Sequence, residues 1–211
     1  VRLKGGDAYI FGRGGEEAEA LFEADVPFIV VPGVTSAVGV AAYAGIPLTH
    51  RRETSTLHFV TGHDPDQIDW PAFASSGTLV IFMGLTTFSA IAERLVQAGR
   101  SPDTPAAAVR WGTRGDQRTV EGTIENLAAK IRRARLKPPA LIVVGEVVSL
   151  RGRLNWFERL PLFGRRVVVT RAREQAGSLA GRLRELGAEV VSLPAIEIQP
   201  LDDYKELDGA L

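Results

Sequence analysis

Leu79-Val80-Ile81-Phe82-Met83-Gly84, with Phe88, Ile91 and Leu95 after it, is the stretch of the sequence that decides the fold class. The apolar run predicts a buried strand that stops at its final glycine. The next apolar residues recur at intervals of three and four, which predicts one face of a helix that Ala98-Gly99 closes. A strand followed by a helix, repeated along a chain, is typical of α/β proteins.

The same alternation continues on both sides of this stretch. Further strands are predicted at residues 28–31, 57–61, 106–110, 141–148, 166–170 and 189–193. Further helical faces are predicted for Ile124, Leu127, Ala128 and Ile131, and for Leu179, Leu183 and Leu186 before a glycine cap at Gly187. Because residues 166–193 read as strand, helix and strand, two parallel strands are expected there.

Composition excludes several classes of protein. The chain has 211 residues, of which 45% are hydrophobic, enough for a buried core. Its 25 Lys and Arg balance 25 Asp and Glu, which disfavours a nucleic-acid binder that works through bulk positive charge. The absence of Cys removes disulfides and thiolate metal sites, and it suits a reducing cytoplasm. No apolar run approaches the roughly 18–20 residues of a membrane-spanning helix.

The three histidines, His50, His58 and His63, lack the spacing of a metal site. Surface or structural roles are expected for them, and no metal is expected.

The first candidate ligand loop is Lys4-Gly5-Gly6-Asp7-Ala8-Tyr9-Ile10-Phe11-Gly12-Arg13-Gly14-Gly15, which follows an apolar start. Glycines let the backbone approach a ligand closely, and such loops bind ligands at strand ends of α/β proteins. Asp7 could accept hydrogen bonds from ribose hydroxyls or an amine, and Arg13 could pair with a carboxylate. The alternative is a flexible turn that leads into a helix. The spacing matches neither the Walker loop nor the dinucleotide fingerprint.

Three more loops follow predicted strands. In Pro32-Gly33-Val34-Thr35-Ser36, the two hydroxyl residues could cap the next helix or present its N-terminus to a ligand. Met83 is the only Met and could be core filler. Gly112, within Trp111-Gly112-Thr113, indicates close approach of backbone to another group.

Taken together, these loops resemble the signature of the uroporphyrinogen-III C-methyltransferases, a branch of the tetrapyrrole methylases. The matching segments are VRLKGGDAYIFGRGGEE at 1–17, VPGVTSAVGVAAYAGIPLTHR at 31–51, VTGH at 60–63, IFMG at 81–84, WGT at 111–113, PALIVVGEVVSLR at 139–151 and LNWF at 154–157. They cover about three quarters of the chain.

The resemblance implies the tetrapyrrole methylase fold, two α/β domains with S-adenosyl-L-methionine in the cleft between them. Residues 1–47 would be the C-terminal part of the first domain, and residues 48–159 the second domain. The cofactor contacts carried over from the family are Gly5, Gly6, Asp7, Ile10, Thr35, Ser36, Met83 and Gly112. Met83 and Gly112 would act mainly through backbone groups.

The resemblance also implies an activity. Members of the family methylate uroporphyrinogen III at C2 and C7 to give precorrin-2, an intermediate of sirohaem and cobalamin synthesis. Because this tetrapyrrole substrate carries many carboxylates, Arg13 and Arg51 are the candidate substrate-binding residues. A homodimer in the cytoplasm is expected from the family, with no nucleic acid and no membrane as partner.

The sequence departs from the family in two places. Ala8 stands where the family usually has Pro, which frees φ in the loop. The family's opening glycine- and proline-rich loop, and the Asp and Lys proposed to transfer protons, have no counterpart here. We therefore expect both ends to be cuts in a longer protein, leave the catalytic residues unassigned, and expect the fragment to be inactive alone.

Residues 160–211 form a separate partial parallel α/β unit in this prediction. Their sequence GRRVVVTRAREQAGSLAGRLRELGAEVVSLPAIEIQP, at 164–200, resembles the start of uroporphyrinogen-III synthase. That enzyme makes the methylase's substrate, which favours a fusion of the two. Two alternatives stay open: a non-catalytic tetrapyrrole-binding module, and a methylase of the same fold acting on a later corrin precursor or in the diphthamide or ribosomal-RNA branch.

Overall fold

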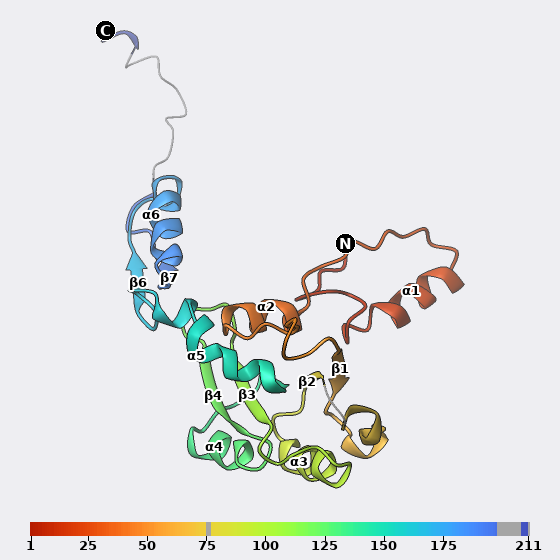
Figure 1. The fold of residues 1–211 in the computed structure, drawn as a ribbon. Coiled ribbons are helices and arrows are strands. Elements are labelled where there is room, and N and C mark those ends of the chain that lie inside the picture. Colours follow the sequence, from red (N-terminus) through yellow and green to blue (C-terminus); the bar gives the residue numbers. More distant parts are fainter. Residues whose placement is uncertain (75–76, 198–207, 211) are drawn as a thin grey trace.

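The computed structural model describes residues 1–74, 77–197 and 208–210, so the last part of the predicted 160–211 unit lies largely outside it. Figure 1 shows an N-terminal lobe around α1, a central sheet with its helices, and a C-terminal lobe. The elements in chain order are α1 (Gly14–Glu23), α2 (Ser36–Tyr43), β1 (Leu57–Thr61), β2 (Thr78–Phe82), α3 (Phe88–Gln97), β3 (Pro105–Arg110), β4 (Arg118–Thr123), α4 (Leu127–Arg133), β5 (Ala140–Val144), α5 (Arg151–Leu154), β6 (Arg166–Val169), α6 (Arg173–Glu185) and β7 (Glu189–Ser192). The predicted α/β class is confirmed.

The central sheet has five strands in the order β1-β2-β5-β3-β4. β1 and β2 are parallel, whereas β5 runs antiparallel to both β2 and β3. β3 and β4 form an antiparallel pair from Pro105–Thr123 to Arg110–Arg118. The sequence predicted β1, β2 and β3 but missed β4, because the segment RTVEGT is too polar to be recognised as a strand.

Both faces of the central sheet are covered, which gives three layers. Leu79 and Ile81 of β2 point to the layer of α3 and α4, where they join Phe88 in one buried cluster. Val80, between them, points to the other layer and packs with Ala37 of α2. Successive residues of a strand face opposite sides of the sheet, so a strand covered on both sides is a continuous apolar run.

The packing of α2 bears on the predicted boundary between residues 47 and 48. Ala37, Ala44 and Ile46 lie in the same buried cluster as Val80 and Val143 of the central sheet. The helix thus packs on the sheet of the second predicted domain, although it precedes the boundary. The boundary itself stays a prediction.

Two elements have bounds that differ from the prediction. The strand expected at 141–148 ends at Val144, because Gly145 has a φ of 145° and a 3₁₀ helix, Glu146–Leu150, follows it. The helix expected from Ile124 begins at Leu127, and Ile124 is fully buried in the preceding turn.

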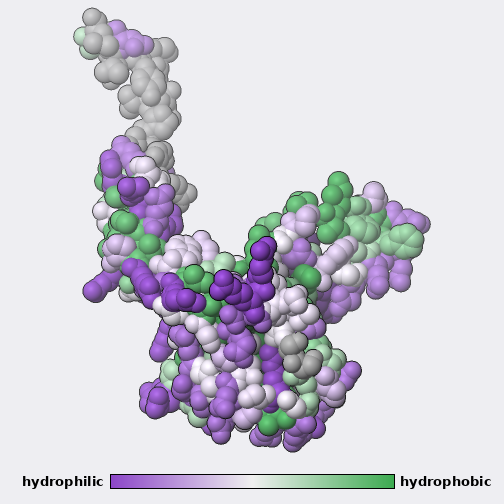
Figure 2. All heavy atoms as spheres, in the orientation of Figure 1, coloured by the Kyte–Doolittle hydropathy of each residue, from purple (hydrophilic) through white to green (hydrophobic). Residues whose placement is uncertain are grey.

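The N-terminal lobe contains α1 and long extended segments. The strand predicted at residues 28–31 is wrong: within the described residues this run forms no ladder, and Ile29 is 90% exposed. An apolar run becomes a strand only where another strand satisfies its backbone groups, and none lies beside it here. Figure 2 shows hydrophobic residues gathered on the surface of this lobe. Leu3, Phe22 and Val31 are among its exposed members.

The C-terminal lobe confirms the predicted parallel unit. β6 pairs in parallel with β7, with Arg166 opposite Glu189, and α6 connects them. The predicted face of α6 is buried only in part: Leu183 is half-buried, but Leu179 and Leu186 are exposed while Ala176 and Ala180 are buried. The three-and-four spacing is shared by both sets of residues, so periodicity alone does not choose the face.

The C-terminal lobe sits on the turn between β3 and β4. The Gly164 N–H donates to the Gly115 carbonyl oxygen at 2.9 Å. A Cβ atom at Gly115 would lie 2.7 Å from the Glu189 nitrogen, so only glycine allows this approach. The Phe157 and Phe163 rings add an edge-to-face contact at 5.4 Å across the junction.

None of the helices in the described ranges is long and apolar enough to span a bilayer.

Candidate functional site

Strained backbone is concentrated in the loops that the sequence selected. Among the described residues, seven non-glycine residues have a positive φ. Two of them follow the ends of helices, a common place for the left-handed conformation. The other five are Phe11, Arg13, Met83, Trp111 and Thr113, which lie in three of the four loops singled out above. Such conformations cost about 1–3 kcal/mol each and cluster at binding sites, so these loops form the candidate site.

The first two loops are fastened to each other by Asp7. Its Oδ1 accepts the Tyr9 N–H at 2.9 Å, and its Oδ2 accepts the Gly33 N–H at 3.0 Å. A Cβ atom at Gly33 would lie 2.7 Å from the Gly6 carbonyl oxygen, so the two backbones touch. Asp7 Oδ1 therefore closes a turn within the first loop, and Oδ2 joins this loop to the second.

The hydrogen bonds that hold Asp7 predict its titration. Backbone N–H groups of Gly33 and Tyr9 stabilise the carboxylate and lower the pKa of Asp7 below its usual value of 3.8. A carboxyl whose pKa is lowered by folding stabilises the fold above its unfolded pKa, and this contribution is lost as the pH falls through the folded pKa. We expect the Gly33 amide resonance to titrate with a midpoint below 3.8. A midpoint at or above that value would show that the link is absent in solution.

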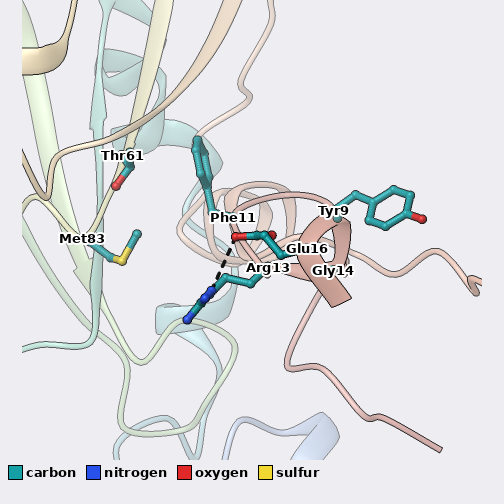
Figure 3. Close-up of a pocket in the computed structure, with 8 residues that line it drawn as sticks. Tyr9, Phe11, Arg13, Gly14, Glu16, Thr61 and Met83 are labelled. Carbon is teal, nitrogen blue, oxygen red and sulfur yellow. Dashed lines mark ion pairs between the residues drawn. The ribbon is translucent and has the colours of Figure 1, made fainter. Parts of the chain in front are cut away.

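The third loop, which contains Met83 and follows β2, faces the N-terminal lobe across a cleft. A cleft of about 470 Å³ is lined by Tyr9, Phe11, Arg13, Gly14, Gly15, Glu16, Thr61 and Met83. Figure 3 shows Thr61 and Met83 on one side of it and Phe11, Arg13 and Glu16 on the other. The Phe11 ring contacts Phe82 of β2 with centroids 4.9 Å apart, which joins the two sides.

Two groups in this cleft are suited to a ligand. Met83 is 56% exposed, so it is a lining residue and not core filler. The Thr61 hydroxyl is buried and has no hydrogen-bond partner within the described part of the chain. A buried polar atom without a partner is unfavourable, and a bound group could satisfy it after a small rotation of the side chain.

The loop after β3 packs on α2. A Cβ atom at Gly112 would lie 2.6 Å from a methyl group of Val40, so α2 lies directly against this glycine. The Arg110 guanidinium stacks on the Trp111 ring at 3.7 Å from its centroid, which fixes the side chain that precedes Gly112. Gly112 is thus held against the helix whose first residue is Ser36.

The structure places the predicted site residues in three groups. Gly6, Asp7 and Thr35 meet where the first two loops touch. Arg13 and Met83 line the cleft. Gly5, Ile10 and Ser36 lie in the same loops and are exposed or nearly so, and Gly112 packs on α2. Their roles as ligands stay predictions.

Arg51 is separated from these groups. It lies exposed in the turn that the His50–Thr54 bridge closes, and it does not line the cleft of Arg13. Phe11 and Thr61 are site residues that the sequence did not single out. Both lie in segments that resemble the family, and this resemblance could have indicated that they belong to the site.

The histidines have local contacts. His50 Nδ1 accepts the Arg52 N–H at 3.3 Å, and the His58 ring packs edge-on against Phe73. His63 is exposed. No group of three His, Cys, Asp or Glu with the geometry of a metal site occurs within residues 1–74, 77–197 and 208–210.

Comparison with known proteins gives a consistent result. The family model of the Tetrapyrrole (Corrin/Porphyrin) Methylases matches residues 1–128. The "Porphyrin biosynthesis protein HemD" of Ruminiclostridium josui is 46% identical over 98% of this chain and 42% of its own length. The "Uroporphyrinogen-III C-methyltransferase" of Bacillus subtilis is 42% identical over 92% of this chain and 41% of its own. The chain thus spans about two fifths of the length of these relatives.

A shorter relative and a solved structure agree. The "S-adenosyl-L-methionine-dependent uroporphyrinogen III methyltransferase" of Methanosarcina barkeri is 52% identical over 71% of this chain and 61% of its own. The uroporphyrin-III C-methyltransferase of Thermus thermophilus, complexed with S-adenosylhomocysteine, is 40% identical with a TM-score of 0.62, over 71% of this chain and 67% of that one. Because the family model spans more than half of the sequence and includes all the loops that form the site, the chain belongs to the tetrapyrrole methylases.

Proposed function

We propose that the chain belongs to an enzyme that transfers methyl groups from S-adenosyl-L-methionine to C2 and C7 of uroporphyrinogen III, giving precorrin-2. The observation that carries this proposal is the cluster of strained loops, which includes Arg13, Met83 and Thr113. Two relatives that are 42% and 52% identical are uroporphyrinogen III methyltransferases, which supports the same substrate and cofactor.

The site fits the proposed cofactor. A Cβ atom at Gly5 would meet nothing within 4 Å, whereas Gly6 is held against the Thr35 backbone, so a ligand could approach one side of a rigid loop. The residues proposed to hold the cofactor are Gly5, Gly6, Asp7, Ile10, Thr35, Ser36, Met83 and Gly112. The bound cofactor would supply an activated methyl group on a sulfonium. The loops would contribute orientation and exclusion of water.

The substrate side of the proposal rests on Arg13. It lines the cleft, and its side chain is 83% exposed. Its ion pair with Glu16 is loose, at 3.5 Å, and such exposed pairs contribute about 0–1 kcal/mol. The guanidinium is therefore free to bind a substrate carboxylate with two parallel hydrogen bonds. Arg51 remains a proposed second contact.

We expect Arg13→Gln to weaken binding of the tetrapyrrole by about 10-fold, the loss of one charge-assisted contact, and to change S-adenosylhomocysteine binding by less than about 2-fold. Glutamine keeps a long side chain at this left-handed position, so the loop should be preserved. Arg133→Gln on α4, an exposed position far from the cleft, is the matched control. Equal losses for both ligands would show that Arg13 supports the loop and does not select the substrate.

The proposed function is tested with the full-length protein. Calorimetric titration with S-adenosylhomocysteine should show binding, and incubation with uroporphyrinogen III and S-adenosyl-L-methionine should add two methyl groups. Binding of both ligands without methyl transfer would support a tetrapyrrole-binding module. Methylation of a later corrin precursor, but not of uroporphyrinogen III, would support the alternative that the protein is a methylase of the same fold with a later substrate.

Two further parts of the proposal concern assembly. We propose a homodimer, which light scattering of the purified protein would test, and a location in the cytoplasm, which cell fractionation would test. We also propose that residues 160–211 begin a uroporphyrinogen-III synthase domain. The relative from Ruminiclostridium josui aligns over 98% of this chain, so its similarity extends into this unit.

A further inference from the structure

A polar cluster lies beneath the loop that follows β3. Its members are Gln117, Thr119, Arg151 and Glu158, and none of them was singled out from the sequence. Gln117 is 3% exposed and Arg151 is 4% exposed. Polar side chains buried to this extent nearly always have hydrogen-bond partners within the protein. The pattern of these bonds therefore shows what the cluster holds in place.

Glu158 is the centre of the cluster. Its Oε1 accepts hydrogen bonds from Thr119 Oγ1 at 2.6 Å and Gln117 Nε2 at 2.8 Å. Its Oε2 accepts from Arg151 Nη2 at 2.6 Å. Burial opposes ionisation of this carboxyl, but the hydrogen bonds from Thr119, Gln117 and Arg151 outweigh it and lower its pKa. Glu158 is thus a carboxylate at neutral pH and can only accept hydrogen bonds.

The carboxylate of Glu158 fixes the orientation of the Gln117 amide. Because Glu158 can only accept, the NH₂ group of Gln117 must face it, which turns Gln117 Oε1 the other way. That oxygen accepts the Thr113 N–H at 2.9 Å. The Gln117 N–H in turn donates to the Arg114 carbonyl at 3.0 Å and closes the turn.

The loop that receives this hydrogen bond is strained. Trp111 has a φ of 50° and Thr113 a φ of 74°, on either side of Gly112. Such conformations persist only where surrounding contacts determine them. The Gln117 side chain is the group that holds the second of these residues through its backbone N–H.

We propose that Gln117, oriented by Glu158, is a positioning residue that sets the Trp111–Thr113 loop for the cofactor. The inference rests on the proposed function, which assigns a cofactor contact to Gly112. The cluster itself acts through the protein backbone and does not touch the reacting atoms.

The test is Gln117→Glu. When ionised, the introduced carboxyl group would face the carboxylate of Glu158 across the former hydrogen bond, and repulsion would displace it from the Thr113 N–H. When protonated, the introduced carboxyl group donates to Glu158 and restores the original pattern. We expect S-adenosylhomocysteine to bind about 10-fold or more weakly than to the wild type near pH 8, and within about 2-fold of the wild type near pH 5.5. Other titratable or charged groups around position 117 include Tyr43, Arg114, Asp116, Arg118, Glu121 and Arg151, so the wild type is titrated in parallel.

A second readout needs no cofactor. Exchange of the Thr113 amide proton should be faster in Gln117→Glu than in the wild type near pH 8, and the two rates should converge near pH 5.5. Gln97→Glu, the same substitution at an exposed position of α3, should match the wild type in both experiments. Thermal melts at both pH values establish that each variant is folded.

Three outcomes decide between the explanations. Wild-type behaviour of Gln117→Glu in both readouts would overturn the inference. An equal loss at both pH values would also overturn it, because the effect would then be a general defect in packing. No cofactor binding by the wild type, with the expected change in Thr113 exchange, would reject the proposed function and leave the positioning role of Gln117 supported.

Discussion

Gly33→Ala is expected to weaken S-adenosylhomocysteine binding by roughly 10- to 100-fold, the equivalent of about 1–3 kcal/mol of overpacking. The added Cβ atom would lie 2.7 Å from the Gly6 carbonyl oxygen, and both partners are backbone. The two loops must therefore separate, which also lengthens the hydrogen bond between the Gly33 N–H and Asp7. Calorimetry on the full-length protein measures the loss directly.

Gly152→Ala is the matched control. A Cβ atom at Gly152 would meet nothing within 4 Å, and this residue lies in α5, where alanine is a better helix former. Its cofactor affinity should equal that of the wild type. If Gly33→Ala also bound normally, the close approach of the two loops would not be part of the cofactor site, and Asp7 would join them without functional consequence.

Phe88→Ala should have the largest effect on stability. Phe88 is 1% exposed in the cluster between α3 and the central sheet, where Ile91 and Leu95 of α3 are also buried. Removing a buried Phe side chain costs about 3–5 kcal/mol, because apolar contacts are lost and a cavity remains. Urea unfolding followed by tryptophan fluorescence should report the loss, since Trp70 lies in the same cluster.

Phe22→Ala makes the same chemical change on the surface. Phe22 is 77% exposed on the N-terminal lobe, so its loss should change the free energy of unfolding by less than about 0.5 kcal/mol. Similar unfolding midpoints for the two variants would contradict the position of the core. A large effect of Phe22→Ala alone would show that the hydrophobic surface of Figure 2 is covered in solution.

The central sheet could be predicted from local sequence because its strands are covered on both faces. β2 is apolar from Leu79 to Phe82, and every residue from Thr78 to Ile81 is buried. The same reasoning fails at residues 28–31, where an equally apolar run has no neighbouring strand among the described residues. Hydropathy indicates whether a segment is buried, whereas a strand also requires a neighbouring strand that forms hydrogen bonds with its backbone.

Helix faces show a similar limit. The spacing of Phe88, Ile91 and Leu95 predicted the buried face of α3, because the opposite side carries charged residues. On α6 the alanines and the leucines are both spaced as a face, and the alanines are buried. Close packing of a helix on a two-stranded sheet favours the smaller side chains, and this choice is made by tertiary structure.

The candidate site was predictable to the extent that glycines and strand ends revealed its loops. Contacts across the cleft, such as Phe11 with Phe82, join residues far apart in the chain, and no spacing rule reveals them. Gln117 and Glu158 were missed for another reason. Each is a single polar residue in a segment without a recognisable motif. Its role depends on hydrogen bonds to residues far away in the sequence, which only the structure reveals.

The turn between β3 and β4 links the C-terminal lobe to the proposed cofactor site. Gly115 receives the C-terminal lobe, and the Thr113 N–H, two residues earlier, is held by Gln117. A rotation of that lobe would therefore also turn the peptide planes near Thr113, which flanks the proposed cofactor contact Gly112. If residues 160–211 begin a second enzyme domain, as proposed, this contact would let a movement of that domain change the backbone of the loop at Gly112.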